Sequence, residues 1–151
     1  MVTRFEQFTS SVASIHRSIQ KIERVEMAKY GLKGPHAQVL LAMARHPEGI
    51  TSGELVKVCD KDKAAISRTV AELEREGMVA RQGKNGNYYR APLTLTDRGR
   101  EAAEQVAIRA TQAVEAASEG LSEGNRRALY IALDLIANHL QAICDHGLAE
   151  E

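Results

Sequence analysis

The sequence lacks most of the features that mark a secreted, membrane or redox protein. It has no tryptophan, two phenylalanines, three prolines and two cysteines among 151 residues. Cys59 and Cys144 lie 85 positions apart (144 − 59), so they form no CxxC pair. No apolar run approaches the roughly 18 residues that span a bilayer. The first ten residues, MVTRFEQFTS, lack the apolar stretch of a signal peptide. We therefore expect a cytoplasmic protein with no membrane contact.

The chain also lacks net charge, since 20 Lys and Arg balance 20 Asp and Glu. The charges are nevertheless unevenly distributed. Residues 57–100 hold ten basic and six acidic residues, a balance of +4, whereas residues 101–151 hold three and nine, a balance of −6. A basic middle and an acidic tail are typical of a protein whose middle alone meets a polyanion. Ordinary variation between solvated faces is the alternative for totals this small.

Motifs for catalysis and metal binding are missing as well. The stretch RQGKNGNYYR at 81–90 contains the residue types of a phosphate-binding loop, which requires GxxxxGK[ST]. Gly77 and Gly83 are one residue too far apart for that motif, and Asn85 stands where Ser or Thr is required. The five histidines form no HxxxH or HExxH pair. We expect no enzyme activity, no cofactor and no metal site, and we interpret Cys59 as a small buried hydrophobe.

The stretch around Asn85 instead predicts a β-hairpin. Asn-Gly between two β-prone runs is a strong signal for a two-residue turn, because both residues accept positive φ. The runs are 78–81 and 88–95, which are rich in Val, Tyr, Thr and Leu. The tip of this hairpin is basic.

Capping signals and apolar spacing predict helices on both sides of the hairpin. Pro35 suits the first turn of one helix. Thr51 with Glu54 forms a capping box for a second. Asp62 can cap a third, which covers 63–76, buries Ile66, Val70 and Leu73, and stops at Gly77. Thr96 and Ser122 can cap two later helices.

The first and last helices carry apolar residues at alternating spacings of three and four, which is a heptad pattern. The short central elements cannot cover both faces, so we predict that a second copy of the chain covers them. Pairing of the two ends within one chain is the alternative. The predicted dimerisation residues are Phe5, Phe8, Val12, Ile15, Ile19, Leu129, Leu133, Ile136, Leu140 and Ile143.

Two helices joined by a short connection around Asp60 and Lys61 have the order of a helix-turn-helix, and the hairpin that follows makes it a winged helix. Arg68 can pair with guanine, and small residues before it let the helix approach base edges. A capped amphipathic helix with a few arginines is also common in proteins that bind no DNA. The predicted DNA-contacting residues are Lys61, Lys63, Ala64, Ala65, Ser67, Arg68, Arg81, Lys84 and Arg90.

Five stretches of the sequence resemble the MarR family of bacterial transcription regulators. They are GPHAQVLLAMA, TSGELVKVC, AAISRTVAELEREGMVAR, LTLTDRGRE and LSEGNRRALYIALDLI. The resemblance implies a homodimer that binds pseudo-palindromic double-stranded DNA through winged helices and, as is often the case in the family, is released by a small-molecule effector or an oxidant. Family wings commonly carry Asp-x-Arg before the last strand, whereas this chain has Asn87 and Tyr89 there.

The predicted fold is mainly α with a small β-hairpin wing (α+β). We assign residues 1–33 to an N-terminal dimerisation helix, 34–100 to the winged helix-turn-helix and 101–151 to C-terminal dimerisation helices. The predicted function is a DNA-binding regulator, most simply a repressor; the alternative is an adaptor that recruits another protein through its terminal helices. The resemblance also implies a ligand pocket, for which Tyr30, His36 and Arg17 are polar candidates, although such residues at helix ends often only bond the backbone.

Overall fold

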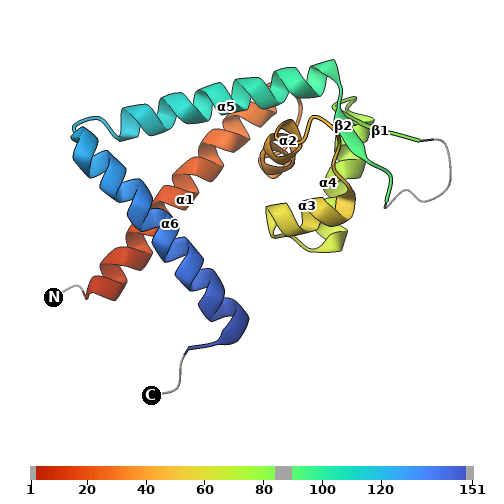
Figure 1. Cartoon of the computed structure of the whole chain (residues 1–151). Coiled ribbons are helices and arrows are strands. Elements are labelled where there is room, and N and C mark those ends of the chain that lie inside the picture. The colour runs from red at the N-terminus through yellow and green to blue at the C-terminus, as the bar shows by residue number, and fades with distance from the viewer. Residues whose placement is uncertain (1–2, 84–89, 149–151) are drawn as a thin grey trace. The chain divides into compact units, whose positions relative to one another are not determined.

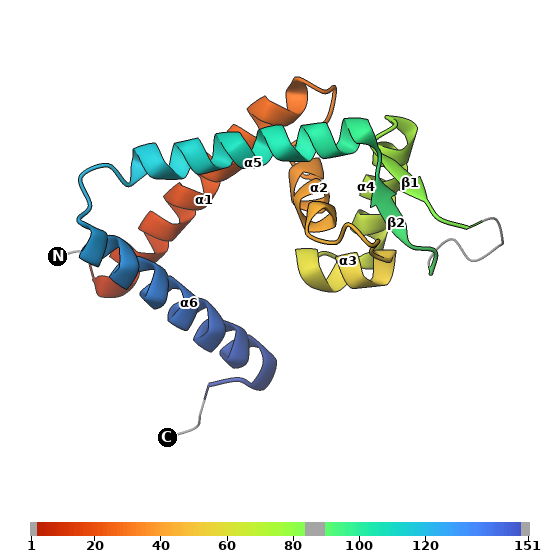
Figure 2. The same ribbon diagram turned by 45° about the horizontal axis from the view of Figure 1, so that its top comes forward.

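The computed structural model describes residues 3–83 and 90–148. Within these ranges the chain is mostly helical, with one two-stranded antiparallel sheet (Figures 1 and 2). This confirms the predicted mainly α fold with a small hairpin. In chain order the elements are α1 (Arg4–Ala28), α2 (His36–Ala44), α3 (Ser52–Cys59), α4 (Lys63–Arg75), β1 (Val79–Arg81), β2 (Leu93–Leu95), α5 (Asp97–Ala117) and α6 (Glu123–His146).

The chain divides into two compact units, Met1–Gln112 and Ala113–Glu151. The first unit contains every element from α1 to β2 and most of α5. The second contains the end of α5 and all of α6. The functional division at 33/34 and 100/101 stays a prediction.

The hydrophobic core lies in the first unit. Leu40 of α2, Leu55 of α3, Leu73 of α4 and Leu93 of β2 are fully buried, and α1 adds Met27 near its C-terminal end. Burial of each such side chain stabilises the fold by about 1.5–3 kcal/mol. The core therefore fixes α4 against α2, α3 and the sheet.

The sheet is small but has a defined register. Ile50, which precedes α3, joins its edge through two backbone hydrogen bonds to Leu93, of 3.0 and 2.9 Å. We predicted the second strand over 88–95, but among the described residues it begins only at Leu93. Pro92 precedes it and has no N–H to donate, although its carbonyl accepts the N–H of Gln82 at 2.8 Å. The paired residues are Val79 with Leu95, Ala80 with Thr94 and Arg81 with Leu93.

Side-chain caps begin the helices where the sequence predicted them. The Thr51 hydroxyl accepts the N–H of Glu54 at 3.2 Å, and the Glu54 carboxylate accepts the N–H of Thr51 at 2.8 Å. Ser122 caps α6 by accepting the N–H of Asn125 at 3.1 Å. These bonds satisfy amides that the helices themselves leave without partners.

The two terminal helices expose the apolar residues of their heptad patterns. On α1, Phe5 is 73% exposed and Ile15 is 61% exposed. On α6, Leu133 is 47% exposed, and no described residue of this helix is buried. No helix in the described parts of the chain is long and apolar enough to cross a membrane. The exposed faces therefore lie on amphipathic helices, each with apolar area that its own unit does not cover.

Gly99 gives a sharp test of the packing between α5 and the sheet. A Cβ atom at this position would lie 2.0 Å from the carbonyl oxygen of Met78, which is backbone and cannot move aside. We expect Gly99→Ala to lower the free energy of unfolding by more than about 2 kcal/mol, through the overpacking that forces backbone shifts. Urea unfolding followed by circular dichroism measures this change.

Gly124, near the start of α6, is the matched control because a Cβ there meets nothing within 4 Å. Gly124→Ala should leave the unfolding midpoint unchanged or raise it, since alanine favours the helix. Equal midpoints for Gly99→Ala and the wild type would contradict the close packing.

Candidate nucleic-acid interface

The connection between α3 and α4 is a tight turn built by two aspartates. Asp60 adopts φ 49° and ψ 49°, the left-handed region that aspartate tolerates better than most residues. The Asp62 carboxylate then accepts the N–H of Ala65 at 2.7 Å and caps α4. The N-terminus of α4 is thus fixed two residues after a sharp reversal, as in a helix-turn-helix.

The buried stripe of α4 determines which residues face outward. Ile66, Val70 and Leu73 are buried, as predicted. The opposite face exposes Ser67 and Arg68. Among the described residues no ion pair involves Arg68, so its guanidinium is available to an outside partner.

The other predicted contacts of α4 surround its N-terminus. Lys61, Lys63 and Ala64 are exposed, whereas Ala65 is half-buried. A helix N-terminus carries a partial positive charge that favours phosphate groups. The structure therefore brings these residues and Arg68 to one region, as predicted, although no described contact tests their role in binding.

Only some of the predicted wing residues lie in the described part of the chain. Lys84, the Asn85-Gly86 turn, Asn87, Tyr88 and Tyr89 fall outside the described residues. Arg90 is exposed. Arg81 is half-buried, and its Nε donates to the Glu74 carboxylate at 2.6 Å.

The sequence did not predict the Arg81–Glu74 ion pair, because we assigned Arg81 only to DNA contact. The two residues are seven positions apart and lie on different elements, so no local spacing indicated the pair. In the structure this ion pair joins the end of α4 to the first strand of the wing.

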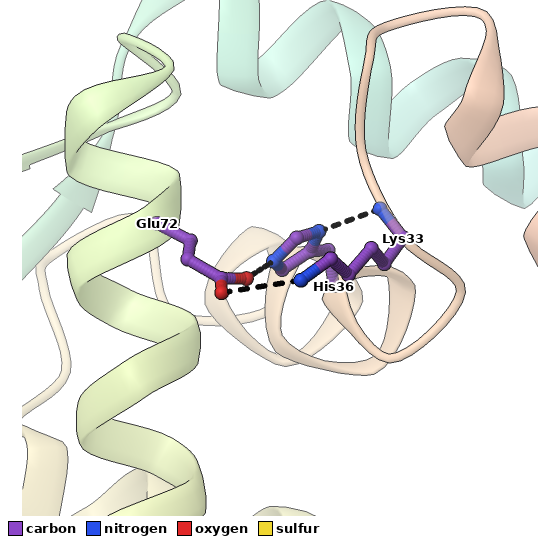
Figure 3. A network of polar contacts seen from close by, with 3 residues as sticks. All are labelled: Lys33, His36 and Glu72. Atoms are coloured by element: carbon purple, nitrogen blue, oxygen red, sulfur yellow. Dashed lines mark hydrogen bonds and ion pairs between the residues drawn. The ribbon is translucent and has the colours of Figure 1, made fainter.

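A second unpredicted group of contacts joins α2 to α4 (Figure 3). His36 is 4% exposed, and its Nε2 lies 2.7 Å from the Glu72 carboxylate. Its Nδ1 accepts the backbone N–H of Lys33 at 2.8 Å, and the Lys33 ammonium approaches Glu72 at 3.4 Å. The hydrogen bond from His36, together with Lys33, holds the pKa of Glu72 below its usual value. His36 thus makes the backbone hydrogen bond that we gave as the alternative to a role in ligand binding.

His36 also lines a cavity of about 290 Å³ inside the first unit. Cys59 and Lys61 contribute from the end of α3 and the turn, and Arg68 and Glu72 contribute from α4. Of the three residues that we considered for a ligand pocket, only His36 lines this cavity; Tyr30 is half-buried against the core and Arg17 is exposed.

The cysteines and histidines form no metal centre in residues 3–83 and 90–148, where no group of three or more metal-ligating side chains occurs. Cys59 packs against the core but is only partly buried, less than predicted, and burial raises the pKa of its thiol. Cys144 is exposed on α6. A raised pKa disfavours the reactive thiolate at Cys59.

Comparison with known sequences points to one family. Residues 30–86 match a family model described as the MarR family. The uncharacterized HTH-type transcriptional regulator YdgJ of Bacillus subtilis (strain 168) is 28% identical over 140 residues, which cover 90% of this chain and 85% of that protein.

Solved structures agree on the fold. A MarR-family transcriptional regulator from Listeria monocytogenes, crystallised with a 26mer DNA, matches with a TM-score of 0.78 at 18% identity, over 95% of this chain and 97% of that one. A crystal structure of MarR matches with a TM-score of 0.78 at 23% identity, over 96% and 98% of the two chains. A MarR-family regulator from Methanosarcina mazei Go1 matches with a TM-score of 0.80 at 20% identity, over 91% and 99%.

The Arg81–Glu74 ion pair can be tested for its contribution to stability by a double-mutant cycle. We expect Arg81→Ala and Glu74→Ala each to destabilise the protein. The double variant should lose less than the sum of the two, with a coupling energy of about 1 kcal/mol because the pair is only half-buried. Urea unfolding of the four proteins measures the coupling.

The Arg100–Asp97 ion pair, whose side chains are 62% and 98% exposed, provides the control cycle. Its coupling should stay below about 0.5 kcal/mol, since solvent screens exposed pairs. Strictly additive losses for Arg81→Ala and Glu74→Ala would show that the described contact does not join α4 to the wing.

Proposed function

Because residues 30–86 match the MarR family and nearly the whole chain has the fold of MarR regulators, we propose that the protein is a DNA-binding transcriptional regulator. The similarity to an HTH-type transcriptional regulator over 90% of this chain supports a regulator in preference to an enzyme. The finer proposal is a homodimeric repressor that binds a pseudo-palindromic operator through α4 and is released by a small ligand.

The exposed face of α4 is the observation that carries the proposal. Ser67 and Arg68 are exposed in the second turn of a capped helix, and Lys61 and Lys63 lie at its N-terminus. Arginine can donate two hydrogen bonds to the O6 and N7 atoms of guanine, and lysines near the free amides can hold the flanking phosphates. We assign base recognition to Arg68 and phosphate contact to Lys61 and Lys63.

Dimerisation is supported by the uncovered heptad faces of α1 and α6. A pseudo-palindromic operator presents the same half-site twice, related by a two-fold axis, and a homodimer presents two copies of α4 with the same symmetry. A second copy of the chain is therefore the partner that explains both features. A repressor needs no more than this, because a bound dimer excludes other proteins from the DNA that it covers.

Release by a ligand is supported by the position of the cavity. Lys61 and Arg68, two of the assigned DNA contacts, line it. A ligand held there would compete with DNA for the same side chains.

Selection of bound fragments from a pool of random DNA tests the function. We expect a two-fold symmetric sequence whose half-site centres lie about one helical turn apart, or a multiple of this distance. Affinity for it should fall steeply with salt, with log K declining by about 0.9 per phosphate contact for each unit of log salt concentration. Failure to enrich any sequence over random DNA would reject the proposal.

Single substitutions in the protein separate base contacts from phosphate contacts. Arg68→Ala should cost about 1–3 kcal/mol on the selected fragment and relax the preference at one base pair of each half-site. Lys61→Ala should weaken binding to all sequences alike and reduce the salt slope. Filter binding on selected and random fragments at several salt concentrations measures both effects.

Arg75 is the matched control, because it is exposed on α4 but two turns beyond Arg68. Arg75→Ala should leave the sequence preference unchanged, since the N-terminal turns of a recognition helix contact the bases. An equal loss on selected and random DNA for Arg68→Ala would argue against a base-reading role.

A charged residue introduced into the heptad face of α6 tests whether the protein forms the proposed dimer. Leu133→Glu should shift the protein from dimer to monomer in sedimentation velocity, because the dimer would have to bury an unpaired carboxylate. Asn138 lies on the opposite side of the same helix in the heptad pattern, so Asn138→Glu should stay dimeric. A wild-type protein that sediments as a monomer at working concentrations would contradict the homodimer and favour the adaptor.

A further inference from the structure

His36 is nearly inaccessible to solvent, yet both of its ring nitrogens have polar partners (Figure 3). One partner is the backbone of Lys33, in the turn between α1 and α2. The other is the carboxylate of Glu72, on α4. A single imidazole therefore connects that turn to the helix that we assign to DNA.

The partners determine which nitrogen carries the proton. The backbone N–H of Lys33 is always a donor, so Nδ1 of His36 must offer a lone pair at the 2.8 Å contact. The ring hydrogen of the neutral form is then on Nε2, which donates it to Glu72 across 2.7 Å. Both contacts are satisfied together only by the neutral imidazole with this tautomer.

A second proton on His36 breaks this arrangement. The imidazolium carries an N–H on each nitrogen, so its Nδ1–H would face the N–H of Lys33 with no acceptor between them. The Nδ1 atom of His36 lies 2.8 Å from the Lys33 nitrogen, which leaves no room for a water molecule to enter between the two donors. The ring must turn away from Glu72, or the turn at Lys33 must move away from the ring.

Several charged and titratable groups surround the His36 ring. Glu72 attracts an imidazolium, but its side chain is 29% exposed and already approached by the Lys33 ammonium. The titratable and charged side chains that line the cavity with His36 are Lys33, Cys59, Lys61, Arg68 and Glu72.

Any movement at Glu72 reaches the assigned DNA contacts directly. Arg68 lies four residues before Glu72, so the two side chains project from the same face of α4, one turn apart. Both line the cavity beside His36. A change in the contact between His36 and Glu72 therefore occurs one helix turn from Arg68, within the same cavity.

We propose that His36 is a positioning residue for DNA binding, whose neutral form orients Glu72 and the adjacent turn of α4 and whose protonation breaks this contact. This rests on the proposed function, because α4 must be the helix that contacts DNA. The proton is then a regulatory ligand of the protein, and acid weakens operator binding through this one buried side chain.

The first test compares pH profiles of DNA affinity between about pH 5 and 8, the range in which histidine side chains change charge. The probe is the fragment selected from random DNA. His36→Gln offers one acceptor and one donor in place of the two nitrogens but does not titrate. We expect the affinity of the wild type relative to His36→Gln to fall from pH 8 to 5 by about tenfold for each half-site, the effect of one lost hydrogen bond, and therefore by about a hundredfold on the whole fragment.

His46 gives the matched control. It is partly exposed and pairs with Glu48 at 3.3 Å in the turn after α2. His46→Gln should follow the wild-type profile, because effects of acid that do not involve His36 are common to both proteins. Parallel profiles for the wild type and His36→Gln, or a flattened profile for His46→Gln as well, would overturn the proposal.

The second test needs neither DNA nor a variant. In nitrogen-15 NMR spectra of the wild type near neutral pH, Nδ1 of His36 should appear unprotonated, and the Lys33 amide should be protected from exchange. Both signals should change together on acidification. The proposal is overturned if Nδ1 of His36 carries a proton near neutral pH. It is also overturned if the signal and exchange rate of the Lys33 amide stay the same on acidification. Absence of any DNA binding would reject the proposed function, while these spectra decide on His36.

Discussion

The burial of Ile66, Val70 and Leu73 is the constraint on which the rest of the structure depends. The three side chains are spaced four and three apart, so they form one stripe that packs into the core. A helix cannot bury one stripe without presenting the opposite one to solvent. The exposure of Ser67 and Arg68 is therefore a consequence of core packing, and the same residues that stabilise the first unit also orient the face assigned to DNA.

Polar contacts complete this arrangement, and they concentrate at the C-terminal end of α4. Glu72 bonds His36, Glu74 bonds Arg81, the Glu76 carbonyl accepts from Arg98 at 3.0 Å, and the next carbonyl, of Gly77, accepts from Thr96 at 2.6 Å. Within the described ranges, Ser67 and Arg68 have no comparable tie. One end of the helix is thus held by α2, β1 and the start of α5, while Ser67 and Arg68 in its second turn stay exposed. Such an asymmetry suits a helix that must be rigidly held and still present its N-terminal turns to a partner.

The sequence predicted the features that depend on residues close together in the chain. The Thr51 capping box, the Asp62 cap and the buried stripe of α4 each follow from residues within a turn or two, so spacing alone reveals them. The tie between His36 and Glu72 joins residues 36 positions apart, and no local pattern contains it. The same reason explains why Arg81 was assigned to DNA without its Glu74 partner. The second strand was predicted too long because β-prone residues before Pro92 outweighed the proline, whose missing N–H affects pairing and not composition.

In a symmetric dimer, the contact between His36 and Glu72 would affect DNA affinity once in each protomer. In the proposed homodimer each half-site is contacted by its own α4, and the binding free energies of two separate half-sites add to a first approximation. A loss that each protomer suffers is therefore counted twice in the free energy and squared in the affinity for the whole operator. One lost hydrogen bond at a buried imidazole in each protomer can then change operator occupancy strongly. The exposed heptad faces of α1 and α6 and the buried network beside α4 are in this sense parts of one mechanism, because the first makes the second act in pairs.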